Sequence, residues 1–164
     1  MEETKQPSKQ VVFISGNTDM NDKQFMTYYA PQIMELANDP NVEFNIGDDE
    51  GCALMVQMLL SKPDKFDKSR VNIFYMGDKI RNIVHKDYIT IGGFQTLEER
   101  NAGMTLSSNL DYHIILEGKG RTMVGDNICR RNSPEYNYGK HFFTGNTPFW
   151  KLFGSANEKE GTNA

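Results

Sequence analysis

The stretch that decides the fold is Val11-Val12-Phe13-Ile14-Ser15-Gly16, four apolar residues followed by a serine and a glycine. A short, continuous run of β-branched and aromatic residues is typical of a strand that is buried on both faces, as in a parallel sheet. The serine and glycine indicate that this strand enters a tight turn at its carboxyl end. We therefore take residues 11–14 as the first strand of a parallel sheet.

Three further strands of the same kind follow at residues 42–46, 71–75 and 111–116. Apolar residues at three- and four-residue spacing predict amphipathic helices over 22–37, 53–60, 97–107 and 123–131. Pro31 lies inside the first helix and indicates a kink or a broken start, and residues 79–94 are expected to form a long connection. Strands that alternate with helices predict a doubly wound α/β sandwich with a mainly parallel sheet of at least four strands.

The length of 164 residues and the 38% of hydrophobic residues favour one domain. We place it at residues 11–153, between a disordered arm of residues 1–10 and a disordered tail of residues 154–164. From about residue 134 the domain carries an aromatic extension, which suits packing or a subunit interface, with base stacking as the alternative.

No apolar run is long enough to span a membrane, and the polar start lacks the apolar segment of a signal peptide. Cys52 and Cys129 are expected to be buried free thiols, because they show no disulfide or metal-ligand spacing. We therefore expect a cytoplasmic protein without a metal site or cofactor.

The charge is distributed unevenly along the chain. The net charge of −4 argues against a nucleic-acid groove, yet residues 119–151 hold six Lys or Arg residues against two acids. This asymmetry is compatible with a small pocket that attracts one phosphate. Arg130 and Arg131 fall at the end of the last predicted helix, where cations complement the helix dipole.

Glycines follow three of the strands, at the edge where an open parallel sheet binds ligands. Glycine lets the backbone approach a ligand, and the next helix directs free N–H groups at an anion. Neither GxGxxG nor GxxxxGK[ST] is intact, which argues against a bound NAD or a P-loop. The candidate ligand-binding residues at these turns are Ser15, Gly16, Asn17, Gly47, Asp48, Gly51, Gly118, Lys119, Gly120, Arg121 and Thr122.

Two of these turns have alternative interpretations. Residues 118–122 place two cations beside a hydroxyl, which suits a phosphate, but they also fit a solvated surface turn. Asp48 suits a bond to a ribose hydroxyl or a cap on the helix that follows it.

Residues 13–16, 47–51, 99–104 and 118–122 together resemble the SLOG superfamily, a Rossmann-like group that includes the "lonely guy" phosphoribohydrolases and the DprA DNA-processing proteins. The resemblance covers about residues 11–132. It implies a nucleotide pocket, in which Arg100 helps to bind the nucleotide, and a homo-oligomer. The catalytic glutamate of the phosphoribohydrolases has no counterpart before Glu135, and Asp126 or Asn127 is the nearest polar substitute.

Three functions are compatible with these features. The leading hypothesis is a protein that binds a nucleotide or nucleotide-derived ligand, as a sensor or to sequester it. The second is an enzyme that cleaves or transfers an N-glycosidic bond, as in the related nucleoside 2-deoxyribosyltransferases, with a carboxylate as nucleophile. Its candidates are Glu99, Glu98, Asp48 and Asp126, although acids in a first helical turn, such as Glu98 and Glu99, also stabilise the helix. The third is a structural interaction protein with a vestigial pocket.

Overall fold

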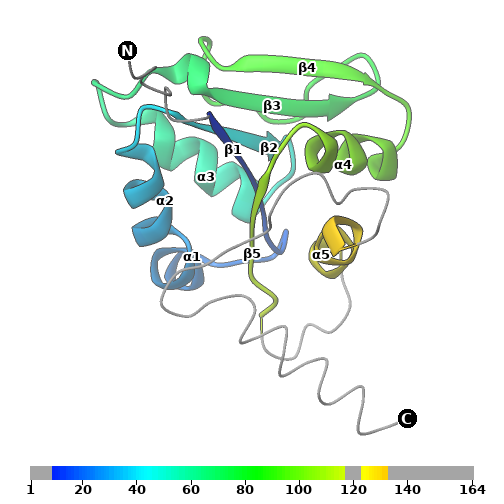
Figure 1. Ribbon diagram of the computed structural model, residues 1–164, viewed down its shortest axis with the longest axis horizontal. Helices are drawn as coiled ribbons and strands as arrows, with labels where there is room; N and C mark the ends of the chain where they lie inside the picture. Colours follow the sequence, from blue (N-terminus) through cyan, green and yellow to red (C-terminus); the bar gives the residue numbers. More distant parts are fainter. Residues whose placement is uncertain (1–8, 117–122, 133–164) are drawn as a thin grey trace, which may run out of the picture.

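A five-stranded, entirely parallel sheet organises the chain (Figure 1). The computed structural model describes residues 9–116 and 123–132. The strands lie in the order β4-β3-β2-β1-β5. They are β1 (Gln10–Ser15), β2 (Val42–Gly47), β3 (Val71–Met76), β4 (Ile89–Phe94) and β5 (Leu110–His113).

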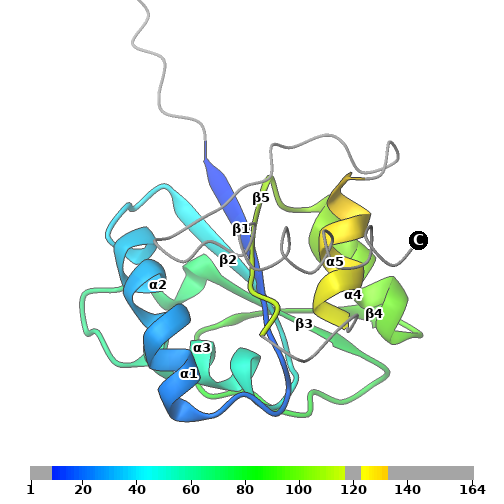
Figure 2. The same ribbon diagram turned by 90° about the horizontal axis from the view of Figure 1, so that it is seen from below.

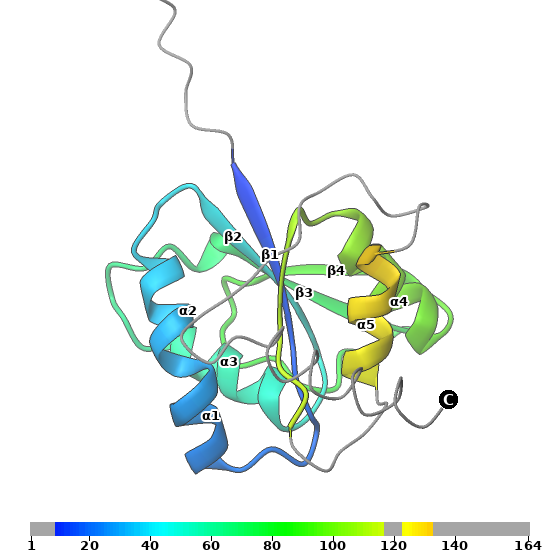
Figure 3. The same cartoon turned by 60° about the horizontal axis from the view of Figure 1, so that its bottom comes forward.

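Helices cover both faces of the sheet, so the predicted α/β class and Rossmann-like fold are confirmed. One group is α1 (Asp22–Tyr28), α2 (Ala30–Ala37) and α3 (Cys52–Ser61). The other is α4 (Leu97–Leu106) and α5 (Met123–Asn132). The two groups lie on opposite sides of the sheet (Figure 2, Figure 3). A short 3₁₀ helix, η1 (Lys68–Arg70), precedes β3.

Two elements differ from the sequence prediction. The first helix is divided into α1 and α2, with Pro31 in the first turn of α2, where its missing N–H costs no hydrogen bond. Residues 79–94 contain the edge strand β4, whereas a connection without a strand was expected. Gly92 and Gly93 interrupt its apolar alternation and are weak strand formers, so the pattern did not indicate a strand.

The two faces of the sheet differ in polarity, because successive side chains of a strand point to opposite faces. Val12, Ile14 and Phe44 belong to the large apolar core that also includes residues of α1, α2 and α3. On the other face, Phe13, Phe74 and Met104 form a smaller apolar cluster. The buried polar residues Ser15, Asn45, Asp111 and His113 occupy the same alternate positions as this smaller cluster.

The strand order reverses beside β1. The chain leaves β1 toward β2, β3 and β4, and then returns to place β5 on the other side of β1. Where the two strands end, the hydroxyl of Tyr29 donates to Ser15 O (2.7 Å) and accepts from Ile114 N–H (2.9 Å). This location, called the switch point below, is where open α/β sheets bind ligands.

Several predictions concern residues outside the described ranges. These are most of the N-terminal arm, the turn at 118–122, the aromatic extension and the C-terminal tail. Within the described ranges, β1 begins at Gln10, a residue that the prediction assigned to the arm, and Lys9 pairs with Glu43 at 2.6 Å. Cys52 is buried as expected, whereas Cys129 is exposed. No helix in residues 9–116 or 123–132 has the length and apolar character needed to cross a bilayer.

Candidate functional site

Ser15 is the centre of a buried polar cluster at the switch point. The parallel register sets Ser15 opposite His113, and Ser15 Oγ lies 2.7 Å from His113 Nδ1. From α5, Asn127 Nδ2 donates to the same Oγ at 3.0 Å. All three residues are buried. The first strand, the last described strand and the last described helix therefore meet at one hydroxyl group.

The hydrogen-bond partners determine which way the Asn127 amide group faces. Arg130 Nη1 donates to Asn127 Oδ1 at 2.7 Å, and because a guanidinium only donates, the amide nitrogen of Asn127 must face Ser15. That nitrogen also only donates, so Ser15 Oγ accepts from it. The 2.7 Å contact with His113 Nδ1 is donated by Ser15 when the imidazole proton is on Nε2, and by His113 when a proton is on Nδ1.

Asp111 lies two residues before His113, on the same face of β5. Its Oδ1 is 3.4 Å from His113 Nε2, which makes no hydrogen bond of good geometry to any residue that the structure describes. Arg131 binds the same carboxylate through Nε (3.0 Å) and Nη2 (2.9 Å). Burial alone would raise the pKa of Asp111, but the neighbouring His113 and Arg131 outweigh it and hold this pKa below its usual value.

Asn17 has an unsatisfied side-chain oxygen two residues after Ser15. The residue is only 7% exposed, and its Oδ1 has no hydrogen-bond partner among residues 9–116 and 123–132. Its backbone is fixed, because Asn17 O accepts from Met20 N and Cys52 N at 3.2 Å each. An unpaired buried acceptor costs about 1–3 kcal/mol, so it is expected to have a partner. We call Ser15, Asn17, Asp111, His113 and Asn127 the switch-point cluster.

A second polar cluster lies at the end of β2. Arg100, which is fully buried, binds Asp48 through Nη1 (2.9 Å) and Asp49 through Nη2 (2.7 Å). Arg81, from the β3–β4 connection, binds the same two carboxylates at 2.9 Å each. A Cβ atom at Gly47 would lie 2.9 Å from the Arg100 guanidinium, so glycine leaves room for that group. We call the four charged residues the β2-end cluster.

Contacts with two arginines lower the pKa of Asp48. Burial by itself would raise the pKa of this carboxyl group, but bonds from Arg81 and the charges of Arg81 and Arg100 lower it. Asp48 does not cap α3, whose N-cap is Gly51 with φ of 69°. The capping alternative is therefore wrong, and the ribose contact stays a prediction.

The structure separates the predicted ligand-binding residues into two groups. Ser15, Gly16, Asn17 and Asn127 belong to the switch point, whereas Gly47, Asp48 and Arg100 lie at the end of β2 or in the helix beside it. Gly51 lies between the two groups, because a Cβ atom there would be 2.2 Å from Thr18 O. All three guanidinium nitrogens of Arg100 bond to Asp48, Asp49 or Asn101. These contacts give Arg100 a structural role, and its role toward a nucleotide stays a prediction.

Three of the predicted catalytic carboxylates lie in exposed positions, whereas Asp48 is buried. Glu98 and Glu99 are in the first turn of α4, and Glu99 Oε2 accepts from Gln95 N at 2.9 Å. This bond satisfies a backbone N–H group beside the helix start, as the structural interpretation of these acids expects. Asp126 is exposed on α5.

Sequence reasoning did not identify Asp111, His113 and Arg131 as site residues. Two polar residues at alternate positions of a buried strand were the available signal. Arg131 was expected to complement the dipole of the last helix, but it is buried against Asp111 and also donates to Ser108 O at 2.8 Å. The helix face that carries Arg131 could not be related to β5 before the tertiary structure was known.

We expect acidification to destabilise the fold through Asp48 and Asp111. The pKa of each is lowered in the folded chain, while in the unfolded chain it is near 3.9. Each ionised carboxylate therefore stabilises the fold above that value, and this stability is lost as the pH falls from about 5 through the lowered folded pKa. Thermal melts at decreasing pH should show a falling melting temperature. The Asp48→Asn variant should be less stable at neutral pH, and its melting temperature should fall less on acidification. An equal fall in melting temperature would contradict the role given to Asp48.

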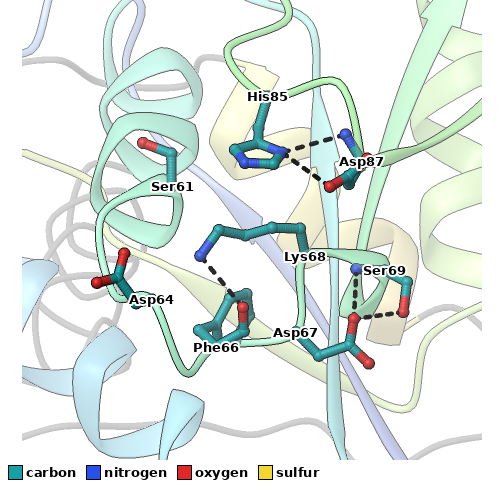
Figure 4. A pocket seen from close by; sticks show the side chains of 8 residues that line it. All are labelled: Ser61, Asp64, Phe66, Asp67, Lys68, Ser69, His85 and Asp87. Carbon is teal, nitrogen blue, oxygen red and sulfur yellow. Dashed lines mark hydrogen bonds and ion pairs between the residues drawn. The ribbon is translucent and has the colours of Figure 1, made fainter.

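A separate cavity of about 520 Å³ lies near the amino ends of β3 and β4 (Figure 4). Several of its polar groups are already bonded: Asp67 accepts from Ser69, Lys68 donates to backbone carbonyls, and His85 Nδ1 accepts from Asp87 N. Among the described residues, no set of three or more His, Cys, Asp or Glu side chains is arranged to hold a metal ion. The switch-point cluster is therefore the better candidate site.

Two comparisons with known proteins identified no relative of this chain. A scan against family models gave no match, and a search of curated proteins gave none either. The SLOG resemblance consequently stays a prediction, and the functional argument depends on the residues at the switch point.

Proposed function

We propose that this protein binds a nucleotide or nucleotide-derived ligand at the switch point, as a sensor or to sequester it. The observation that carries the proposal is Asn17 Oδ1, a buried acceptor that lies two residues beyond the end of β1 and has no partner in the described part of the chain. Its position is the one at which open α/β sheets bind ligands.

The chemistry of this atom restricts which part of the ligand it contacts. An amide oxygen accepts hydrogen bonds, so its partner must carry an O–H or N–H group. A ribose hydroxyl or a base amino group fits, whereas an ionised phosphate oxygen does not. The phosphate is better matched to the cations predicted at residues 118–122, which lie outside the described residues.

The enzymatic alternative with a carboxylate nucleophile is less well supported. Glu98 and Glu99 begin α4, which packs against β2, β3 and β4, whereas the switch point lies between β1 and β5. The carboxylate within the switch-point cluster, Asp111, is already bound by Arg131. Ligand binding is therefore the function that these positions favour.

A thermal-shift screen with nucleoside monophosphates, cyclic nucleotides, ADP-ribose and ribose 5-phosphate tests the proposal. At least one compound should raise the melting temperature, because a ligand that binds only the folded state stabilises it. Asn17→Ala should weaken the affinity for that compound by about 2- to 12-fold, the equivalent of one neutral hydrogen bond.

The matched control is Asn41→Ala, which alters an exposed asparagine in the turn before β2. This variant should bind like the wild type. If no compound shifts the melting temperature at saturating concentration, the proposed function is wrong. An unchanged affinity in Asn17→Ala would remove Asn17 from the site.

A further inference from the structure

Ser15, His113 and Asp111 form a chain of contacts that matches the roles of a nucleophile, its base and a carboxylate that orients the base. We propose that Ser15 Oγ is a nucleophile, activated by His113, that accepts the acyl or phosphoryl group of an ester bound at the switch point. This inference rests on the proposed function, because the ester belongs to the ligand bound there.

The contacts of the Ser15 hydroxyl support its role as the nucleophile. A base must hold a free lone pair toward the proton that it removes. With the imidazole proton on Nε2, His113 Nδ1 holds a lone pair toward the Ser15 hydroxyl, and the 2.7 Å distance is suitable for direct transfer. Ser15 Oγ accepts one hydrogen bond from Asn127, which leaves its second lone pair for attack.

The balanced step forms one bond and breaks one. Ser15 Oγ bonds to the carbonyl carbon or phosphorus, and its proton moves to His113 Nδ1. The bond from that carbon or phosphorus to the ester oxygen breaks, and this oxygen takes the proton from His113 and leaves as an alcohol. Water then repeats the sequence and releases the acid. During each attack His113 becomes an imidazolium, with its Nε2–H 3.4 Å from the Asp111 carboxylate.

Arg131 and Phe13 complete the arrangement. Arg131 pairs with Asp111 at 2.9 Å and holds this carboxylate beside His113. The Phe13 ring contacts the imidazole edge to face, with centroids 4.7 Å apart, and limits its rotation. Asp111, Arg131 and Asn127 are positioning residues in this scheme.

Reaction with an alkyl fluorophosphonate tests the nucleophile without any nucleotide. Attack by Ser15 forms the Oγ–P bond and expels fluoride, so intact-protein mass spectrometry should show one adduct, and peptide mapping should place it on Ser15. Ser15→Ala should abolish the adduct. His113→Gln should slow its formation by about 100-fold or more, the usual contribution of a general base.

Matched controls are Ser61→Ala and His85→Gln, which alter residues of the separate cavity and should react like the wild type. The mapped adduct on the wild-type chain needs no variant, so it stays decisive if a variant fails to fold. No adduct on the folded wild type, an adduct elsewhere, or an unchanged rate in a folded His113→Gln variant would overturn the proposal.

Two further measurements separate this inference from the proposed function. The compound that raises the melting temperature should also protect Ser15 from labelling. A thermal shift without labelling would retain the binding function and refute the nucleophile, whereas labelling without any thermal shift would retain the nucleophile and refute the nucleotide ligand. Turnover of p-nitrophenyl acetate or of bis(p-nitrophenyl) phosphate would then distinguish acyl from phosphoryl transfer.

Discussion

Arg100→Met is expected to lower the free energy of unfolding by about 3–5 kcal/mol, the range for removing one partner of a buried ion pair. The loss arises because Asp48 and Asp49 stay in place without their fully buried counter-ion. Urea denaturation followed by circular dichroism would measure it. A loss below about 1 kcal/mol would show that Arg100 is not the main counter-ion.

Arg81→Met is the matched control, because Arg81 binds the same two carboxylates. Its side chain is 47% exposed, so its ion pairs are screened by water and should contribute no more than about 1 kcal/mol. Combining Arg100→Met with Asp48→Asn and Asp49→Asn should recover part of the loss, because the uncompensated charges are then removed.

Arg131→Met is expected to have an effect of similar size, about 3–5 kcal/mol. It leaves the buried Asp111 carboxylate without its bidentate partner, and it removes the bonds from α5 to Ser108. Because these contacts attach α5 to β5 and to the end of α4, the variant should also expose α5 amides to faster hydrogen exchange.

Arg130→Met is the control on the same helix. Arg130 is partly exposed and donates to Asn127 Oδ1, so its loss should cost about 1 kcal/mol or less. The double variant Asp111→Asn/Arg131→Met should lose less free energy of unfolding than the two single variants lose together, because the effects of substituting paired residues are not additive. Additive losses would contradict direct pairing of Asp111 with Arg131.

Most of the fold could be predicted from local patterns. The apolar run at residues 11–14 and its three counterparts correspond to β1, β2, β3 and β5, because burial on both faces requires such runs. The edge strand β4 was missed because an edge strand needs no continuous apolar pattern, and two glycines obscure the alternation. Pro31 correctly indicated an interruption, since proline interrupts a helix wherever it falls in the interior.

The candidate site was predicted only in part. Ser15 and Asn17 follow from the rule that strand ends hold ligands, and this rule depends on local sequence and strand direction. The rule does not reveal that Ser15 contacts His113, 98 positions later in the chain, or that Arg100 binds Asp48, 52 positions earlier. Those pairings depend on strand order and register.

The sequence by itself therefore determined the parallel α/β architecture and the first residues of the switch point, because periodicity, glycine turns and proline act within a few residues. The tertiary structure decided what the charged residues do. It placed Arg100 and Arg131 inside the protein as counter-ions of Asp48, Asp49 and Asp111, and it brought His113 to Ser15. The physical reason is that a buried charge requires a partner, and only the order β4-β3-β2-β1-β5 determines which residue is close enough.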